Sequence, residues 1–155
     1  MIKITPLQKG HLEALSHVYV KAYRTRGELW SPERAKLLLE NYLKKQSDLA
    51  LVAELGGNLV GGFMALLKPW WDGNHLVETE IFVDPDMHKS GIGKLLFKEL
   101  LMIAKKKYNA VIFEGITFSK INFPISWYSR LGINKAEELM FIDGKVDTIL
   151  EKLNQ

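Results

Sequence analysis

Residues 83–94, VDPDMHKSGIGK, join a strand pattern to a helix pattern and carry the most information in this chain of 155 residues. Gly91 and Gly93 allow a ligand to approach the backbone closely, because glycine has no side chain. The helix that begins beside them presents unpaired N–H groups and the positive end of its dipole, which suit a phosphate or pyrophosphate group. An ordinary strand-to-helix turn also uses glycine, so the stretch by itself leaves both interpretations open.

Two common phosphate-binding motifs fit this stretch less well. A P-loop requires glycine at position 88 and serine or threonine at position 95, where this chain has His88 and Leu95. The dinucleotide-binding fingerprint requires a third glycine at position 96, which is Leu96, and an early βαβ unit. The stretch therefore differs from both motifs.

The apolar pattern on either side predicts a mixed sheet of about seven strands with about four helices. Strands are expected at 2–5, 49–55, 59–67, 76–83 and 110–116 and on both sides of Asp143-Gly144, a dipeptide typical of hairpins; turns at 56–58 and 69–73; and helices over 12–23, from Ser31-Pro32, from near Gly91, and over 123–130 with Gly132 at its end. This order, β-α-α-β-β-β-α-β-α-β-β, predicts the α/β class with a parallel pair of strands, the fourth and fifth, across the third helix.

Composition favours one soluble globular domain over residues 1–155, because 47% of the residues are hydrophobic and 25% are charged. The absence of cysteine excludes disulfides and thiolate nucleophiles, and the four histidines are not spaced as a metal site. Without a secretory signal or an apolar run of about 20 residues, a cytoplasmic protein with no membrane partner is expected. The net charge of +3, without a basic stripe interleaved with aromatic residues, gives little support to a nucleic-acid partner.

Two motifs make the chain similar to the GCN5-related N-acetyltransferases. The first is Val83-x-Pro85 followed by residues 88–93, HKSGIG, which match the family's Arg/Gln-x-x-Gly-x-Gly/Ala hallmark except that histidine stands at its first position. The second is the aromatic-Tyr pair at 127–128, placed before Gly132-Ile133. The order of the elements also matches along nearly the whole chain. The resemblance implies acetyl-CoA as cofactor and a sheet whose fourth and fifth strands splay apart.

In this family the pantetheine arm of acetyl-CoA enters the gap between those strands, and its pyrophosphate binds the glycine-containing turn. Carried over to this chain, the resemblance implies a cofactor-binding set of Ile81, Phe82, Val83, His88, Lys89, Ser90, Gly91, Ile92, Gly93, Lys94 and Asn122. A backbone N–H on residues 81–83 would stabilise the charge that develops on the thioester oxygen. Asn122 would bind the pantetheine arm, or else cap the helix that follows it.

An amine must be neutral to attack a thioester, so a base or a chain of waters must take its proton. Glu80 is the first choice of base, because it lies nearest the thioester site and matches an acidic position of diamine acetyltransferases in the family. Glu78, on the same strand, and Glu114, which interrupts an apolar strand, are the other candidates. Tyr128 is the expected general acid for the departing thiolate, and a core aromatic residue would also fit its pattern.

The predicted activity is transfer of an acetyl group from acetyl-CoA to a primary amine of a small molecule, such as a polyamine, an aminoglycoside or an amino acid. Residues 23–30, between the first two helices, would close over the acceptor by analogy with the family. A protein amine as acceptor, and a non-catalytic CoA-sensing module on the same fold, stay open as alternatives. A homodimer is also compatible with the sequence, since members of the family are often dimers.

Overall fold

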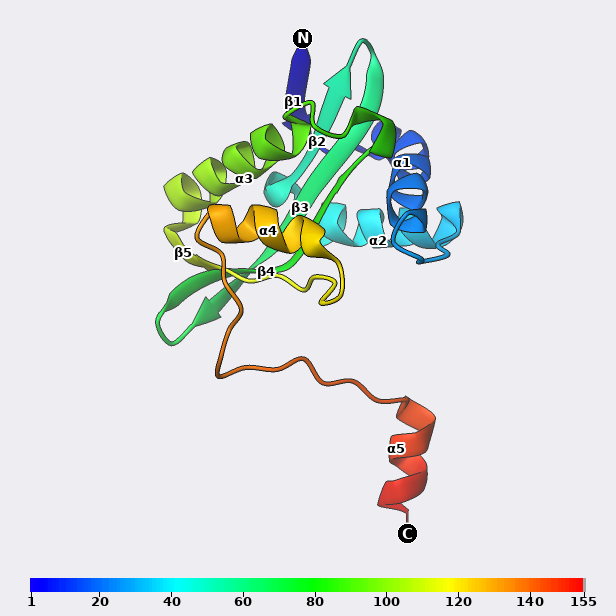
Figure 1. Ribbon diagram of the computed structural model, residues 1–155, viewed down its shortest axis with the longest axis vertical. Helices are drawn as coiled ribbons and strands as arrows, with labels where there is room; N and C mark the ends of the chain where they lie inside the picture. Colours follow the sequence, from blue (N-terminus) through cyan, green and yellow to red (C-terminus); the bar gives the residue numbers. More distant parts are fainter. Residues whose placement is uncertain (155) are drawn as a thin grey trace. The chain divides into compact units, whose positions relative to one another are not determined.

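The computed structural model describes residues 1–154 and divides the chain into two units, Met1–Ile116 and Thr117–Gln155. The first, here called the N-terminal unit, holds the sheet (Figure 1). The second, the C-terminal unit, is helical and is described by itself. Among residues 1–154, no helix has both the length and the apolar character that a membrane span requires.

The sheet of the N-terminal unit has five strands in the order β1-β2-β3-β4-β5. Its strands are β1 Ile2–Pro6, β2 Ala50–Leu55, β3 Asn58–Trp70, β4 Gly73–Val83 and β5 Ala110–Phe113. The first four pair antiparallel in sequence order, and β5 pairs parallel to β4. The mixed sheet and its parallel fourth and fifth strands confirm the predicted class.

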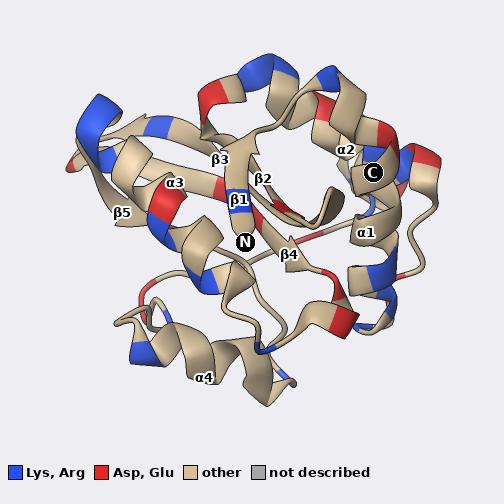
Figure 2. Cartoon of the chain, turned by 90° about the horizontal axis from the view of Figure 1, so that it is seen from above, with Lys and Arg blue, Asp and Glu red and all other residues tan. Residues whose placement is uncertain are grey.

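Helices cover both faces of this sheet, as Figures 1 and 2 show together. They are α1 Leu12–Arg24 and α2 Pro32–Lys45 on one face and α3 Ile92–Tyr108 on the other, with short 3-10 turns η1 Lys9–His11, η2 Ser47–Leu49 and η3 Pro85–Met87. The start of α2 is the one predicted, because the hydroxyl of Ser31 accepts a hydrogen bond from the backbone N–H of Arg34 and Pro32 stands in the first turn.

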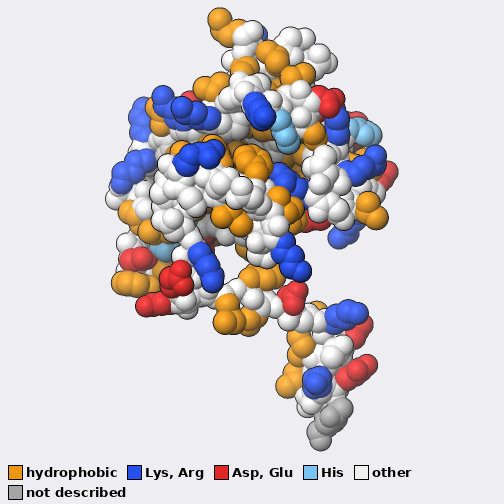
Figure 3. Space-filling model, viewed as in Figure 1, with side chains coloured by type: hydrophobic (Ala, Val, Ile, Leu, Met, Phe, Trp, Pro, Cys, Tyr) orange, Lys and Arg blue, Asp and Glu red, His pale blue; other side chains and the backbone are white. Residues whose placement is uncertain are grey.

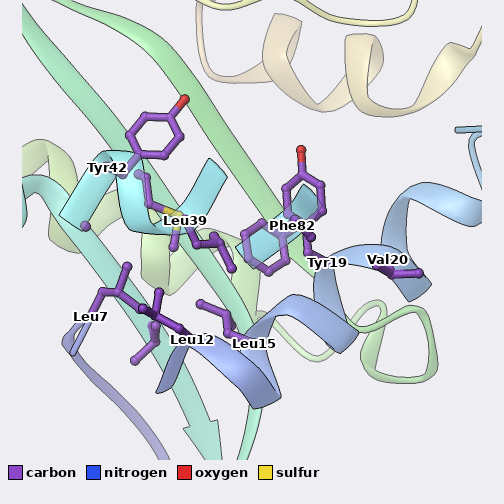
Figure 4. Packing of buried hydrophobic residues seen from close by; sticks show 12 residues of the cluster. Leu7, Leu12, Leu15, Tyr19, Val20, Leu39, Tyr42 and Phe82 are labelled. Atoms are coloured by element: carbon purple, nitrogen blue, oxygen red, sulfur yellow. The ribbon is translucent and has the colours of Figure 1, made fainter. Parts of the chain in front are cut away.

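The core is built where α1 and α2 pack on the sheet (Figure 4). Leu15 and Leu39 are fully buried there, and the ring of Tyr19 meets that of Phe82 edge-on with centroids 4.9 Å apart. Burial of such side chains contributes about 1.5–3 kcal/mol each. The apolar face of α1 therefore stands directly over the part of β4 that carries Phe82 and, two residues earlier on the same face, Glu80.

The predicted hairpin around Asp143-Gly144 is wrong, and the sheet has five strands rather than about seven. The C-terminal unit contains α4 Asn122–Arg130 and α5 Val146–Leu153, and no strand lies in its residues up to 154. The sequence VDTILEKL repeats apolar residues at helical spacing, and this period outweighs the local turn signal. Figure 3 shows the resulting apolar side of α5, whose Ile149 and Leu150 are exposed.

Three strand boundaries also differ from those predicted by more than one residue. β3 continues to Trp70 and β4 begins at Gly73, so the turn spans fewer residues than the expected 69–73. Gly73 has a φ of +138°, and a Cβ placed on it would lie 2.6 Å from Cγ2 of Val111, so glycine is required where β5 approaches this turn. β5 itself ends at Phe113 rather than at residue 116.

Candidate active site

β4 and β5 part soon after they begin to pair. Their parallel register ends at Leu76↔Phe113, with one further bond from the N–H of Glu114 to the carbonyl of Leu76 at 2.9 Å. β4 then runs on to Val83, and within residues 1–154 its only strand partner over that length is β3. One edge of β4, including residues 81–83, is therefore free of strand pairing, as the predicted splay requires.

The turn from β4 to α3 places Gly91 at the start of the helix with a φ of +83°. A Cβ built on Gly91 would meet no atom within 4 Å, and as glycine this N-cap residue has no side chain to cap the first N–H groups of α3. These groups carry the positive end of the dipole of a helix of 17 residues. His88, Lys89, Ser90 and Lys94 are exposed around them. The turn is therefore compatible with an anionic group such as a diphosphate.

Two ion pairs tie this turn to α1. The ammonium of Lys21 lies 2.6 Å from a carboxylate oxygen of Asp84 and 2.6 Å from one of Asp86. Figure 2 shows α1 beside the turn. Because Lys21 and Asp86 are largely exposed, the two pairs add little to stability, and their effect is mainly to fix geometry.

Glu80 lies beneath α1 and is held by two tyrosines of that helix. Its Oε2 accepts hydrogen bonds from the hydroxyl of Tyr19 at 3.1 Å and from the hydroxyl of Tyr23 at 2.5 Å. Burial raises the pKa of Glu80, the two tyrosine hydrogen bonds oppose this shift, and the negative charge of Glu28 reinforces it. Burial and the nearby Glu80 charge raise the pKa of both tyrosines, so they stay neutral donors. The arrangement yields a carboxylate with increased affinity for a proton.

The other two candidate carboxylates lie elsewhere. Glu78 occupies a bulge of β4 with a φ of +48°, its side chain is exposed, and its backbone carbonyl accepts a hydrogen bond from Tyr42. Glu114 follows β5, where its carboxylate binds the ring of His75. The structure therefore does not bring the three predicted carboxylates together, and Glu80 alone of them is held beneath α1.

His75 joins β4 to the end of β5 through its two ring nitrogens. Nδ1 lies 2.5 Å from Oε1 of Glu114, and Nε2 lies 2.8 Å from Oδ1 of Asp72. Its side chain is 7% exposed. The two carboxylates contact opposite nitrogens of the ring, so they are not arranged around a common metal ion. Residues 1–154 contain no group of three or more side chains that could hold a metal ion. The cluster fixes the place where the two strands part.

We expect His75 to make folding stability depend on pH. The hydrogen bond with Glu114, reinforced by that with Asp72, raises the pKa of His75 above its usual value of 6.5, although burial opposes this. A raised folded-state pKa adds stability that is complete below the unfolded pKa and lost as pH rises through the folded one. Urea unfolding at pH values from 5.5 to 9 should show the free-energy difference between wild type and His75→Gln shrinking as pH rises.

The matched variant for this measurement is Glu114→Gln, which removes the first partner and leaves the ring in place. The free energy of unfolding of Glu114→Gln should depend less on pH over the same range than that of the wild type. A difference between wild type and His75→Gln that stays constant from pH 5.5 to 9 would contradict the assignment of a charged cluster.

The C-terminal unit carries the two remaining predicted residues. Asn122 is the first residue of α4 and is exposed, while Tyr128 is partly buried, with its ring 5.3 Å from that of Trp127. The helix ends as predicted, since Gly132 has a φ of +81° and its N–H donates to the carbonyl of Ser129. The functions expected of Asn122 and Tyr128 stay predictions.

The hydroxyl contacts of Tyr19 and Tyr23 with Glu80 are not among the contacts predicted from the sequence. Both residues lie on the apolar face of α1, yet each hydroxyl reaches a carboxylate about 60 residues away along the chain. The signal available in the sequence was a pair of tyrosines four residues apart on a face otherwise built of aliphatic residues.

Comparisons with known proteins agree with this architecture. The model of the acetyltransferase (GNAT) family matches residues 12–132. A possible acetyltransferase from Clostridium difficile 630 superposes with a TM-score of 0.78 at 17% identity, over 94% of this chain and 99% of that one. The aminoglycoside N-acetyltransferase AAC(6')-Iy in complex with CoA superposes with a TM-score of 0.71 at 19% identity, over 94% of this chain and 95% of that one. These structures share the fold.

An uncharacterized N-acetyltransferase of Methanocaldococcus jannaschii is 29% identical over 140 residues, which cover 86% of this chain. The match spans 61% of that relative, so this chain corresponds to about three fifths of it. Because the family model covers most of the chain, the chain belongs to the GNAT family of acetyltransferases.

Proposed function

We propose that this chain is an acetyl-CoA-dependent N-acetyltransferase that acts on a primary amine of a small molecule. The observation that carries the proposal is the position of Glu80, a partly buried carboxylate with a raised pKa on the strand whose neighbouring edge is unpaired. Membership of the GNAT family and structural likeness to an aminoglycoside N-acetyltransferase in complex with CoA support it.

Residues 88–94 would hold the diphosphate of acetyl-CoA through the first N–H groups of α3, and the free edge of β4 at residues 81–83 would pair with the pantetheine arm. Lys89 and Lys94 add positive charge at the turn. When bound, acetyl-CoA supplies a thioester carbon that an amine can attack. A backbone N–H of β4 would donate to the thioester oxygen as negative charge develops there.

Glu80 would act as the base that takes a proton from the ammonium group of the acceptor, which leaves the amine neutral. The nitrogen–carbon bond would then form, the nitrogen would lose its second proton, the carbon–sulfur bond would break, and the thiolate would take up a proton. Tyr128 is the proposed donor of that proton, and Asn122 a proposed contact of the pantetheine arm.

Thiol release from acetyl-CoA tests the proposal, with a panel of polyamines, aminoglycosides, free amino acids and lysine peptides as acceptors. The expected result is thiol production above the enzyme-free rate with at least one small amine and less with lysine peptides. Tight CoA binding without thiol release from any acceptor would contradict it and favour a CoA-sensing module, and release with peptides alone would favour a protein acceptor.

A further inference from the structure

The two tyrosine hydroxyls that hold Glu80 are themselves fixed by packing. The rings of Tyr19 and Tyr23 stack with centroids 4.4 Å apart. Tyr19 also meets Trp30 edge-on at 5.1 Å and Phe82 edge-on at 4.9 Å. Tyr19 is 1% exposed, so its ring has little freedom to turn away. Both hydroxyls are therefore presented to one carboxylate oxygen by side chains from α1, β4 and the segment before α2.

Both tyrosines donate to Oε2 of Glu80, and neither of them donates to Oε1. The Glu80 side chain is only partly buried, so its second oxygen, Oε1, is the one left for an acceptor. Because two hydrogen bonds already occupy Oε2, a proton from an acceptor would go to Oε1.

The charged and titratable groups around Glu80 come from each element packed against it. They are Tyr19 and Tyr23 on α1, Glu28 in the segment after α1, Tyr42 on α2 and Glu78 on β4. Glu28 favours the protonated carboxyl because it is negative, and its own carboxylate accepts a hydrogen bond from the indole N–H of Trp30 at 2.6 Å. The hydroxyl of Tyr42 donates instead to the carbonyl of Glu78. Tyr19 and Tyr23 are thus the groups that favour the ionised carboxylate.

We propose that Tyr19 and Tyr23 are positioning residues, which hold Oε2 of Glu80 so that Oε1 takes the proton of the acceptor amine. This inference rests on the proposed function and extends it to two residues outside the family motifs identified in the sequence. Removal of the Tyr23 hydroxyl should affect Glu80 more than removal of the Tyr19 hydroxyl, because Tyr23 makes the shorter hydrogen bond with Glu80.

The test removes one hydroxyl at a time, with Tyr23→Phe, Tyr19→Phe and the control Tyr42→Phe. Loss of a hydrogen bond to the ionised form raises the pKa of Glu80, and a base with a higher pKa works only at higher pH. The acid limb of kcat/KM should move up by about one pH unit in Tyr23→Phe and by less in Tyr19→Phe. In Tyr42→Phe it should stay where it is in the wild type.

A second measurement needs no substrate. Carbon-13 NMR titration of the glutamate carboxyl groups, with the Glu80 signal assigned from its loss in Glu80→Gln, should show the same upward shift in Tyr23→Phe. An unmoved signal, or an equal shift in Tyr42→Phe, would overturn the proposal. So would a shifted signal with an unmoved acid limb, because Glu80 would then not be the base. A wild-type chain that releases no thiol would defeat the proposed function itself, and the NMR titration distinguishes that failure from a failure of the hydroxyl contacts.

Discussion

Replacing Gly91 with leucine should weaken coenzyme A binding at least 100-fold, a loss of about 2.7 kcal/mol, while the fold is retained. A Cβ at this position meets no protein atom within 4 Å, so the new side chain would enter the space proposed for the diphosphate. Isothermal titration calorimetry with coenzyme A measures the effect directly. Circular dichroism and urea unfolding check that the variant is folded.

The chain offers a closely matched control in Gly57, which lies in the turn between β2 and β3. Gly57 and Gly91 both have a φ of +83°, and a Cβ on Gly57 also meets nothing within 4 Å. Leucine at either site pays a similar backbone strain of about 1–2 kcal/mol, so Gly57→Leu removes strain as an explanation. Gly57→Leu should bind coenzyme A as the wild type does, and equal affinity of the two variants would contradict the diphosphate site.

Glu80→Gln should lower kcat about 10²–10⁴-fold, the usual contribution of a general base. The amide has nearly the shape of the carboxylate and can still accept hydrogen bonds from Tyr19 and Tyr23, but it cannot take a proton at neutral pH. The acid limb of the pH profile should disappear with the carboxylate. Coenzyme A affinity should be unchanged, because the diphosphate site uses other residues.

Glu78→Gln is the control for this substitution, since it makes the same chemical change two residues away on an exposed side chain. It should leave steady-state thiol release close to the wild-type rate. Full activity of Glu80→Gln across the pH range, or an equal loss in Glu78→Gln, would assign the proton transfer to another group or to water.

The sequence allowed the mixed sheet to be predicted because its signals there are local. The Ser31-Pro32 start of α2 and the glycines beside α3 each act within a few residues. The Asp143-Gly144 hairpin was predicted with the same kind of signal and was wrong, because the helical period that follows it was not weighed against the dipeptide.

The candidate site was less predictable because its contacts join distant parts of the chain. Glu80 could be chosen from its place on β4, but its bonds to Tyr19 and Tyr23 depend on how α1 lies over the sheet. The bulge at Glu78 interrupts the regular alternation of side chains between the two faces of β4, so Glu78 does not share a face with Glu80 as an unbroken strand would require. No residue type at this position predicts a bulge.

The ion pairs of Lys21 connect α1 to the turn that precedes α3. Lys21 stands between Tyr19 and Tyr23 in sequence, and it grips Asp84 and Asp86 just ahead of the glycine turn. One helix, α1, therefore contacts both Glu80, the proposed base, and the segment just before the proposed diphosphate site. A change in the tilt of α1 would therefore alter the positions of both, which couples the two parts of the proposed site.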